Sequence, residues 1–366
     1  MTLFSTFPSS AARLLLGSVL ALGLASCDSD DEPEAVDIPS NSVLVLNEGN
    51  FQKANAEVSV FSKNTNEVLY KSAFSAANKE SLGDVAQNIS LQGSTAYIVV
   101  NNSNKLEAVS LPNFKRVGKV ENLKLPRYFV ANGSKGYVTE TIAYDGQPGQ
   151  VSVINLNSYS VAKTITVGKQ PERLLLVGNR LYVTNSGDNT VTVINTTTDQ
   201  VEGTITVGDS PNSLAQDFEG NVWVLSGGKV AYNADYSVDY TRTTKGSLAK
   251  IIPGQLTVAT TLEMPSNLSS PNRLTINGTK NELFYTYQNG VYLYPVGNAT
   301  LATSPIIRRN FYALAVDPVD RTVYGGVASF TSTDKVIRYR TGAPGNAYTA
   351  IDSFSVNIGP NGFVFN

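Results

Sequence analysis

The chain has 366 residues, of which 42% are hydrophobic, so it can bury a large core, and a repeat fold can hold it in one domain. Its 28 basic and 30 acidic side chains leave a formal charge of −2, which argues against a nucleic-acid-binding surface and a basic lipid-binding stripe. There is no histidine, which removes the commonest general base and metal ligand. We therefore expect no metal site, no required cofactor, and a protein that binds a ligand rather than an enzyme.

Residues 1–26 are predicted to be a lipoprotein signal peptide. Arg13 precedes the apolar run 14–24, and small residues follow before Cys27. The run is about half as long as the roughly 20 residues that a membrane-spanning helix needs. Cys27 is the sole cysteine, so it cannot form an intramolecular disulfide. The signal peptide accounts for it as the lipidated first residue of the mature protein.

Residues 27–41 are predicted to be a lipidated acidic tether, because the segment 28–34 is too polar to fold. A cysteine followed at once by Ser, Asp and Glu resembles the surface-export signal of Bacteroidota lipoproteins. That resemblance implies a protein anchored in the outer membrane through its lipid alone and exposed on the cell surface. A periplasm-facing protein is the alternative, and in enterobacteria an aspartate after the cysteine would instead suggest retention in the inner membrane.

Residues 42–366 are predicted to form a single β-propeller domain. Three eleven-residue strings nearly superimpose: VSVFSKNTNEV (58–68), VSVINLNSYSV (151–161) and VTVINTTTDQV (191–201). Their alternation around a polar turn is typical of two antiparallel strands. A short loop running into an apolar strand recurs seven times, mostly 40 to 50 residues apart, which is the repeat length of a four-stranded blade.

The two ends of this domain complement each other. The segment 169–208 contains four predicted strands in the order RLLLV, RLYVTN, TVTVIN and VEGTITVG. The domain begins with VLVLN, which matches the second of these strands, and it ends with GFVFN, which matches the first. We therefore predict an all-β, seven-bladed propeller of four-stranded antiparallel blades, whose last blade is closed by N- and C-terminal strands.

The strings LYVTN (181–185), VTVIN (191–195) and TITVG (204–208) resemble the repeats of YVTN-type, YncE-like propellers. LNEGNF (46–51), just after the tether, is similar to the start of Bacteroidota surface propellers, including the BtuG-type cobalamin-binding proteins. The resemblance covers about 42–366. It implies a surface propeller that captures cobalamin as a transported ligand and passes it to a TonB-dependent outer-membrane receptor. No set of cobalamin-contacting residues carries over one by one.

The ligand site is expected at the mouth of the propeller, where the loops that enter the inner strands and the loops between second and third strands emerge together. The ligand-binding candidates on these loops are Asn50, Phe51, Asn88, Arg127, Tyr128, Tyr144, Arg173, Asn212, Tyr232, Tyr236, Asn272, Arg273 and Tyr312. Two alternatives stay open at this point. The tyrosines of the insertion 226–246 either contact ligand or anchor their loop, and Arg173 and Arg273 either contact ligand or make structural contacts in the channel.

Three functions follow from these observations. The first is cell-surface capture of a ligand, cobalamin above all, by a monomeric propeller. The second is a non-catalytic protein-interaction scaffold at the cell envelope. The third is a lactonase- or lyase-like propeller enzyme, which is disfavoured because no catalytic constellation is found without histidine.

Overall fold

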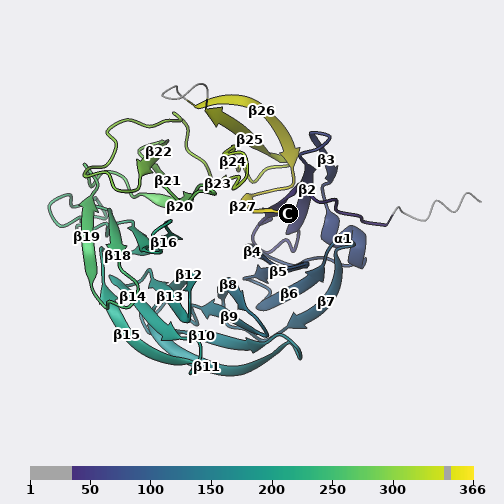
Figure 1. Cartoon of the computed structure of the whole chain (residues 1–366), viewed down its shortest axis with the longest axis horizontal. Coiled ribbons are helices and arrows are strands. Elements are labelled where there is room, and N and C mark those ends of the chain that lie inside the picture. The colour runs from purple at the N-terminus through teal and green to yellow at the C-terminus, as the bar shows by residue number, and fades with distance from the viewer. Residues whose placement is uncertain (1–34, 342–347) are drawn as a thin grey trace, which may run out of the picture. The chain divides into compact units, whose positions relative to one another are not determined.

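In the part of the chain that the structure describes, alternating apolar and polar residues form 27 strands. The same part contains one short helix, α1 (Ala73–Asn78). The structure, a computed structural model, describes residues 35–341 and 348–366. Cys27, the predicted signal peptide and most of the predicted tether lie outside these residues. The strands form seven antiparallel sheets arranged in a ring around one axis (Figure 1). The prediction of a seven-bladed β-propeller is confirmed.

We number the blades in chain order, and within each blade we give the strands in order from the axis outward. Blade 1 contains β4 (Ala86–Gln92), β5 (Thr95–Val100), β6 (Lys105–Ser110) and β7 (Lys115–Val120), and blade 2 contains β8 (Pro126–Asn132), β9 (Lys135–Glu140), β10 (Pro148–Asn155) and β11 (Ser160–Lys169). Blade 3 contains β12 (Pro171–Val177), β13 (Arg180–Asn185), β14 (Thr190–Asn195) and β15 (Gln200–Thr206), and blade 4 contains β16 (Pro211–Gln216), β17 (Val222–Ser226), β18 (Ser247–Ile251) and β19 (Val258–Glu263). Blade 5 contains β20 (Asn272–Ile276), β21 (Glu282–Tyr287) and β22 (Gly290–Pro295), and blade 6 contains β23 (Ala313–Val316), β24 (Val323–Val327), β25 (Asp334–Thr341) and β26 (Tyr348–Val356). Blade 7 contains β27 (Pro360–Phe365), β1 (Ser42–Asn47), β2 (Glu57–Ser62) and β3 (Glu67–Tyr70).

The seventh blade joins the two ends of the propeller, as predicted. β27 pairs with β1 in the register Val43↔Phe365 and Val45↔Phe363. The innermost strands contact one another in the order β27, β4, β8, β12, β16, β20, β23 and back to β27. The ring is therefore closed by strand pairing between the first and last strands of the domain, and β1 has a partner strand on both of its edges.

Blade 5 is the least regular of the seven. Its sheet has three strands, and the fourth position is reduced to one antiparallel bridge between Val291 and Ile307. Pro295 ends β22, and Pro305 lies two residues before the bridge. Because proline has no N–H to donate to a strand ladder, Pro305 cannot extend the pairing on its side of the bridge.

Apolar clusters between neighbouring blades form the core. Tyr137 and Val153 of blade 2 pack with Leu181 and Ile194 of blade 3, and every one of these side chains is almost completely buried. Trp223 of β17 is 2% exposed and donates its indole N–H to Asp217 at 2.8 Å, so it is a core residue whose polar atom is satisfied. The blades thus hold the inner strands, and the loops that enter them, in fixed positions.

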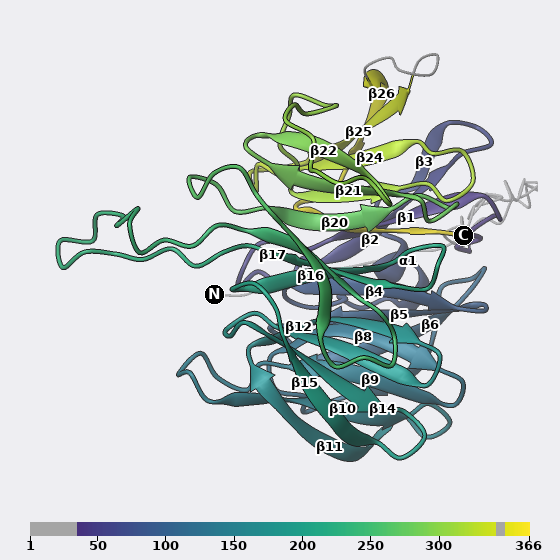
Figure 2. The same ribbon diagram turned by 60° about the vertical axis from the view of Figure 1, so that its left-hand side comes forward.

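The insertion 226–246 projects from the body of the propeller between β17 and β18 (Figure 2). It doubles back on itself through a bridge between Tyr232 and Val238. Asp239 orders its return by accepting hydrogen bonds from Thr241 and Arg242. We call residues 227–246 the arm.

Candidate functional site

A cavity of about 400 Å³ lies where the inner strands begin, at the mouth of the propeller. Eight of the predicted ligand-binding candidates line it: Arg127, Tyr128, Tyr144, Arg173, Asn212, Asn272, Arg273 and Tyr312. Seven other residues complete its wall: Glu48, Gln87, Thr141, Gln170, Glu172, Ser186 and Asn361. The volume lies within the roughly 300–1,000 Å³ that small-molecule sites have.

Each blade contributes one side chain to the cavity from the same place in its repeat. In five blades this residue directly follows a proline at the start of the inner strand. In the other two blades it follows Ala86 or Phe311, which take the place of the proline. We call these side chains the entry ring, and all of them line the cavity: Gln87, Arg127, Glu172, Asn212, Asn272, Tyr312 and Asn361. The sequence repeat therefore becomes a ring of polar groups around the axis.

Irregular pairing at the start of the inner strands turns these side chains toward the axis. The register between β8 and β9 shifts between Pro126 and Phe129, and that between β12 and β13 shifts between Pro171 and Leu174. Such bulges redirect the side chains of the residues that they contain. In these two blades those residues are Arg127–Tyr128 and Glu172–Arg173.

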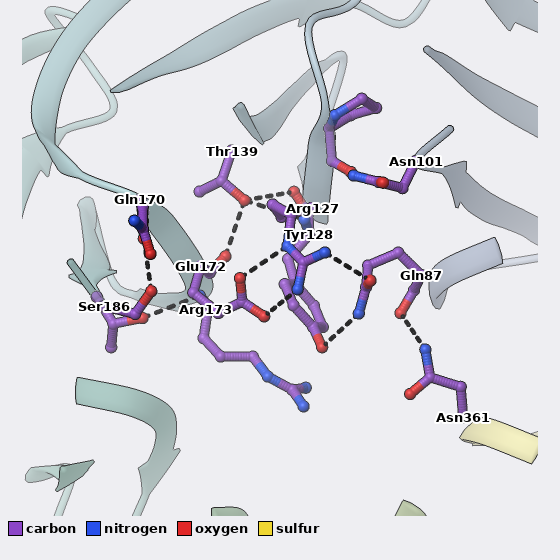
Figure 3. Close-up of polar contacts among 12 residues, drawn as sticks. Gln87, Asn101, Arg127, Tyr128, Thr139, Gln170, Glu172, Arg173, Ser186 and Asn361 are labelled. Carbon is purple, nitrogen blue, oxygen red and sulfur yellow. Dashed lines mark hydrogen bonds and ion pairs between the residues drawn. The ribbon is translucent and has the colours of Figure 1, made fainter. Parts of the chain in front are cut away.

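Arg127 connects three blades. Its guanidinium binds both carboxylate oxygens of Glu172 at 2.8 Å and donates a third hydrogen bond to Gln87, also at 2.8 Å (Figure 3). Burial by itself would lower the pKa of Arg127, but the Glu172 carboxylate outweighs burial and raises it. Gln87 also donates to the hydroxyl of Tyr128 at 3.2 Å. Arg127 is thus a structural link whose charge is neutralised.

Arg173 has no such partner. Its guanidinium carbon lies 4.0 Å from the centre of the Tyr128 ring, in the geometry of a cation–π contact. Among the described residues, no carboxylate lies within 4 Å of its charged nitrogens, and its Nε is buried without a hydrogen-bond partner. Burial lowers the pKa of Arg173, and the nearby Arg273 lowers it further, although arginine keeps its charge at neutral pH. Figure 3 shows this guanidinium apart from the linked groups around Arg127.

Arg273 repeats this arrangement in blade 5. Its guanidinium carbon lies 5.2 Å from the centre of the Tyr312 ring. It donates one hydrogen bond, at 3.3 Å, to the side-chain oxygen of Asn361, and within the described chain it also has no carboxylate partner. The sequence left two alternatives open for these arginines, a structural contact in the channel or a contact with ligand. Among the described residues, neither arginine forms a structural salt bridge.

Glu48 is the second carboxylate of the cavity. It belongs to the Asn-Glu-Gly-Asn string that begins with Asn47, the last residue of β1, and it accepts a hydrogen bond from the hydroxyl of Tyr312. Burial raises the pKa of Glu48, and burial together with the Glu48 charge raises the pKa of Tyr312. The cavity therefore contains three arginines against two glutamates, and Arg127 and Glu172 neutralise each other.

Five predicted candidates lie away from this cavity. Asn88 faces a second cavity of about 230 Å³ deeper along the axis, and its side-chain oxygen accepts from the backbone of Phe129 at 3.0 Å. Asn50 donates to the backbone of Phe330 at 2.9 Å, so it holds two loops together. Phe51 is exposed, and Tyr232 and Tyr236 are exposed on the arm. Whether these five side chains touch a ligand stays a prediction.

The sequence contained a signal for the wall residues that were not predicted. Gln87, Glu172 and Asn361 occupy the same repeat position as Arg127, Asn212 and Asn272. Aligning the seven loop strings by this position finds the whole entry ring. Thr141 and Ser186 lie in loops between second and third strands, which were expected at the mouth, and Gln170 directly precedes Pro171 at the start of β12.

No group of three or more Cys, Asp or Glu side chains in residues 35–341 and 348–366 is arranged to hold a metal ion. No helix in these same residues is long and apolar enough to cross a membrane.

Three solved structures with a similar fold are distant from this chain in sequence. A Bacteroides fragilis protein provisionally assigned as a 6-phosphogluconolactonase superimposes with a TM-score of 0.62 at 13% identity, covering 88% of this chain and 97% of its own. A Bacteroides uniformis protein with the same provisional assignment gives a TM-score of 0.65 at 11% identity, covering 89% and 99%. The dihydro-heme d1 dehydrogenase NirN gives 0.54 at 11% identity, covering 91% and 77%. At these identities the likeness shows the fold alone.

Sequence comparison gives the family but no activity. No functionally curated protein matches the chain significantly. The family model described as "Domain of unknown function (DUF5074)" matches residues 41–358, which is most of the chain and nearly the whole propeller. The chain therefore belongs to the DUF5074 family.

Proposed function

We propose that this protein is a lipid-anchored propeller of the outer membrane that captures a ligand in the mouth cavity without transforming it. One observation carries the proposal: every blade directs its entry-ring side chain into the same 400 Å³ cavity. A concave site with a few converging polar groups is the usual form of a small-molecule site. The propeller holds these groups on rigid strands, which lowers the entropy lost when a ligand binds.

The position of the described N-terminal residues supports the proposed anchor. Residue Asn41 donates its backbone N–H to Asn366, at the end of β27, at 2.8 Å. β27 begins at the mouth with Pro360 and runs away from it, so the chain enters the propeller at the face opposite the mouth. The described residues that precede β1 therefore leave the mouth open. Surface exposure, rather than a periplasmic location, is part of this proposal.

Cobalamin is the first ligand to test, because the resemblance to BtuG-type propellers implies it. Cobalamin is larger than the cavity, so it would lie across the mouth with only a part of it inserted. Its amide side chains and its phosphodiester are groups that the asparagines and arginines of the wall bind well. Delivery to a TonB-dependent receptor belongs to the same proposal.

Isothermal titration of the mature protein with cyanocobalamin tests this version. The expected result is a saturable heat at micromolar ligand in the wild type, and weaker binding when Tyr144→Ala removes an exposed ring from the mouth. Phe218→Ala, an exposed aromatic residue that does not line the cavity, is the matched control. No heat at about 100 μM ligand, a concentration that detects interactions of roughly −6 kcal/mol or stronger, excludes cobalamin as the ligand.

The arm favours a second function, the holding of a partner protein. Tyr232, Tyr236 and Tyr240 are 57%, 86% and 55% exposed on it, and tyrosine is enriched in protein interfaces. Lipidated protein with the arm replaced by a short Gly-Ser turn would be compared with the wild type in pull-downs from its own outer membrane. Recovery of a TonB-dependent receptor by the wild type alone supports this function, and equal recovery by both proteins contradicts a role of the arm.

Catalysis is the alternative that the proposal excludes. Glu48 and Tyr312 are the cavity groups closest to an acid–base pair, since the hydroxyl of Tyr312 donates to the carboxylate. Hydrolysis of 6-phosphogluconolactone, the substrate class suggested by the two distant Bacteroides structures, provides the test. A rate above the uncatalysed reaction that disappears in Glu48→Gln would contradict the proposal of a non-catalytic protein.

A further inference from the structure

Two arginines that line the mouth cavity have no carboxylate of the described chain in direct contact with them. Arg127 is neutralised by Glu172, but Arg173 and Arg273 have no carboxylate within 4 Å among the described residues. A buried charge is normally paired, because its removal from water is costly. An unpaired arginine inside a cavity therefore indicates that a partner is supplied from outside.

The packing around the two arginines keeps them in place without satisfying them. Each lies against a tyrosine ring, Arg173 on Tyr128 at 4.0 Å and Arg273 on Tyr312 at 5.2 Å. A ring face supports a guanidinium but occupies none of its N–H donors. The Nε of Arg173 has no hydrogen-bond partner in the described chain, and Arg273 donates to Asn361 alone.

The two charges also act on each other. Arg273 is among the groups that lower the pKa of Arg173, which is the effect of one positive charge on another nearby. Both arginines line the mouth cavity as well as the deeper cavity, so they lie at the boundary between the two. An anion that enters from the mouth reaches both of them and relieves their repulsion.

We infer that the ligand carries an oxyanion, a carboxylate or a phosphate, which binds between Arg173 and Arg273. This inference rests on the proposed capture of a ligand at the mouth and names its chemical class. The planar guanidinium forms two parallel hydrogen bonds to either kind of oxyanion. Because both arginines line the same cavity, they can bind one anion together.

The rest of the wall fits a hydroxylated body for this ligand. The side-chain amides of Gln170 and Asn272 and the hydroxyl of Ser186 line the cavity together with the ring of Tyr144. Amides and hydroxyls exchange hydrogen bonds with hydroxyl groups in both directions, and a ring face covers the C–H side of a sugar. A sugar acid or a sugar phosphate combines both features.

Inorganic phosphate is the first probe, because it tests the oxyanion site without assuming the ligand's body. Thermal unfolding is followed at constant ionic strength with phosphate exchanged for chloride. We expect saturating phosphate to raise the melting temperature of the wild type by roughly 2–5 °C. The rise should disappear in Arg173→Gln and Arg273→Gln and persist in Arg340→Gln, a half-exposed arginine paired with Asp320 outside the cavity. Equal shifts in all four proteins, or none in the wild type, overturn the inference.

Isothermal titration with glucose 6-phosphate, glucuronate and glucose then identifies the source of the oxyanion. Binding of a charged sugar but not of glucose is expected, with affinity reduced roughly 10- to 100-fold in Arg173→Gln. Arg173→Lys keeps the charge but not the forked donors, and is expected to bind with intermediate affinity. Glucose binding as tightly as the charged sugars contradicts the inference.

The two proposals fail in different ways. If cyanocobalamin binds the wild type and Arg173→Gln equally, and phosphate has no specific effect, capture at the mouth stands and the oxyanion site falls. If neither cyanocobalamin nor any anion binds the wild type, the proposed function fails as well.

Discussion

Glu172 and Arg173 are neighbours in β12 and have opposite roles. The Glu172 carboxylate pairs with Arg127 of the next blade at 2.8 Å, while the guanidinium of Arg173 lies on the Tyr128 ring and pairs with no carboxylate of the described chain. Glu172 therefore forms an ion pair between two blades, while Arg173 leaves its charge unpaired in the cavity.

Arg173→Gln is expected to leave the protein as stable as before, or more stable. Burial of the unpaired charge costs several kcal/mol, and the contact with Tyr128 returns about 1–2 kcal/mol of that. The free energy of unfolding in urea should rise, or fall by less than about 1 kcal/mol. A loss above about 2 kcal/mol would show that Arg173 is a structural residue.

Arg127→Gln should behave in the opposite way. It removes the partner of Glu172 and a hydrogen bond to Gln87, and both side chains of the ion pair are about one-fifth exposed. We expect a loss of about 2–3 kcal/mol in the free energy of unfolding, measured in urea. The double variant Arg127→Gln/Glu172→Gln should recover part of this loss, since it removes the stranded charge. A double variant that loses the sum of both single changes contradicts the pairing.

Glu48 should make stability depend on pH. Burial raises its pKa above the ordinary value of 4.5, so the folded state holds this proton more tightly than the unfolded state does. The protein is then most stable below pH 4.5 with respect to this group, and stability falls as the pH rises from 4.5 through the folded pKa. Glu48→Gln removes the effect, so the stability of the variant relative to the wild type should grow between pH 4.5 and 7.5. A constant difference across that range contradicts the prediction.

The same variant should bind anions more tightly. Glu48 is the carboxylate of the cavity that has no arginine within 4 Å in the described chain, so at neutral pH it repels an entering anion. Glu48→Gln is expected to strengthen phosphate binding several-fold, as seen in the phosphate concentration that gives half of the thermal shift. Glu57→Gln, a buried glutamate outside the mouth cavity, serves as the control and should change nothing.

Closure of the ring should be essential for folding. Deletion of residues 360–366 removes β27, which pairs with β1 and places Phe365 5.3 Å from the ring of Tyr324. We expect this deletion to abolish cooperative thermal unfolding, because it opens the ring and exposes the inner edge of β1. Shortening the arm to a Gly-Ser turn should leave the melting temperature within about 2 °C, because the arm is largely exposed. Cooperative unfolding of the first variant would contradict the importance of closure.

Most of the fold was predictable because each blade repeats the same local pattern. The strings around 191–201 have alternating apolar residues and a polar turn, and these form β14 and β15 as expected. The pairing of β27 with β1 followed from the matching of VLVLN and GFVFN to adjacent strands of a whole blade. Helix α1 and the single bridge in blade 5 were not predicted, since both depend on irregular segments without a repeat.

The site was predictable only in part. Arg173 and Arg273 were recognised as mouth residues, but Glu172 was missed, although it occupies the repeat position of Arg127. Which arginine is paired cannot be derived from the repeat, because the pairing of Arg127 with Glu172 crosses between blades. The bulge between Ala86 and Asn88 brings Gln87 into the mouth and leaves Asn88 facing the deeper cavity.

The central claim is that an oxyanion binds between Arg173 and Arg273 at the mouth. A crystal structure of the mature protein soaked with tungstate, a tetrahedral oxyanion with a strong anomalous signal, tests it most directly. We predict an anomalous peak between the two guanidinium groups in the wild type and none there in Arg173→Gln. Tungstate bound only elsewhere, or at the same place in both proteins, would contradict the claim.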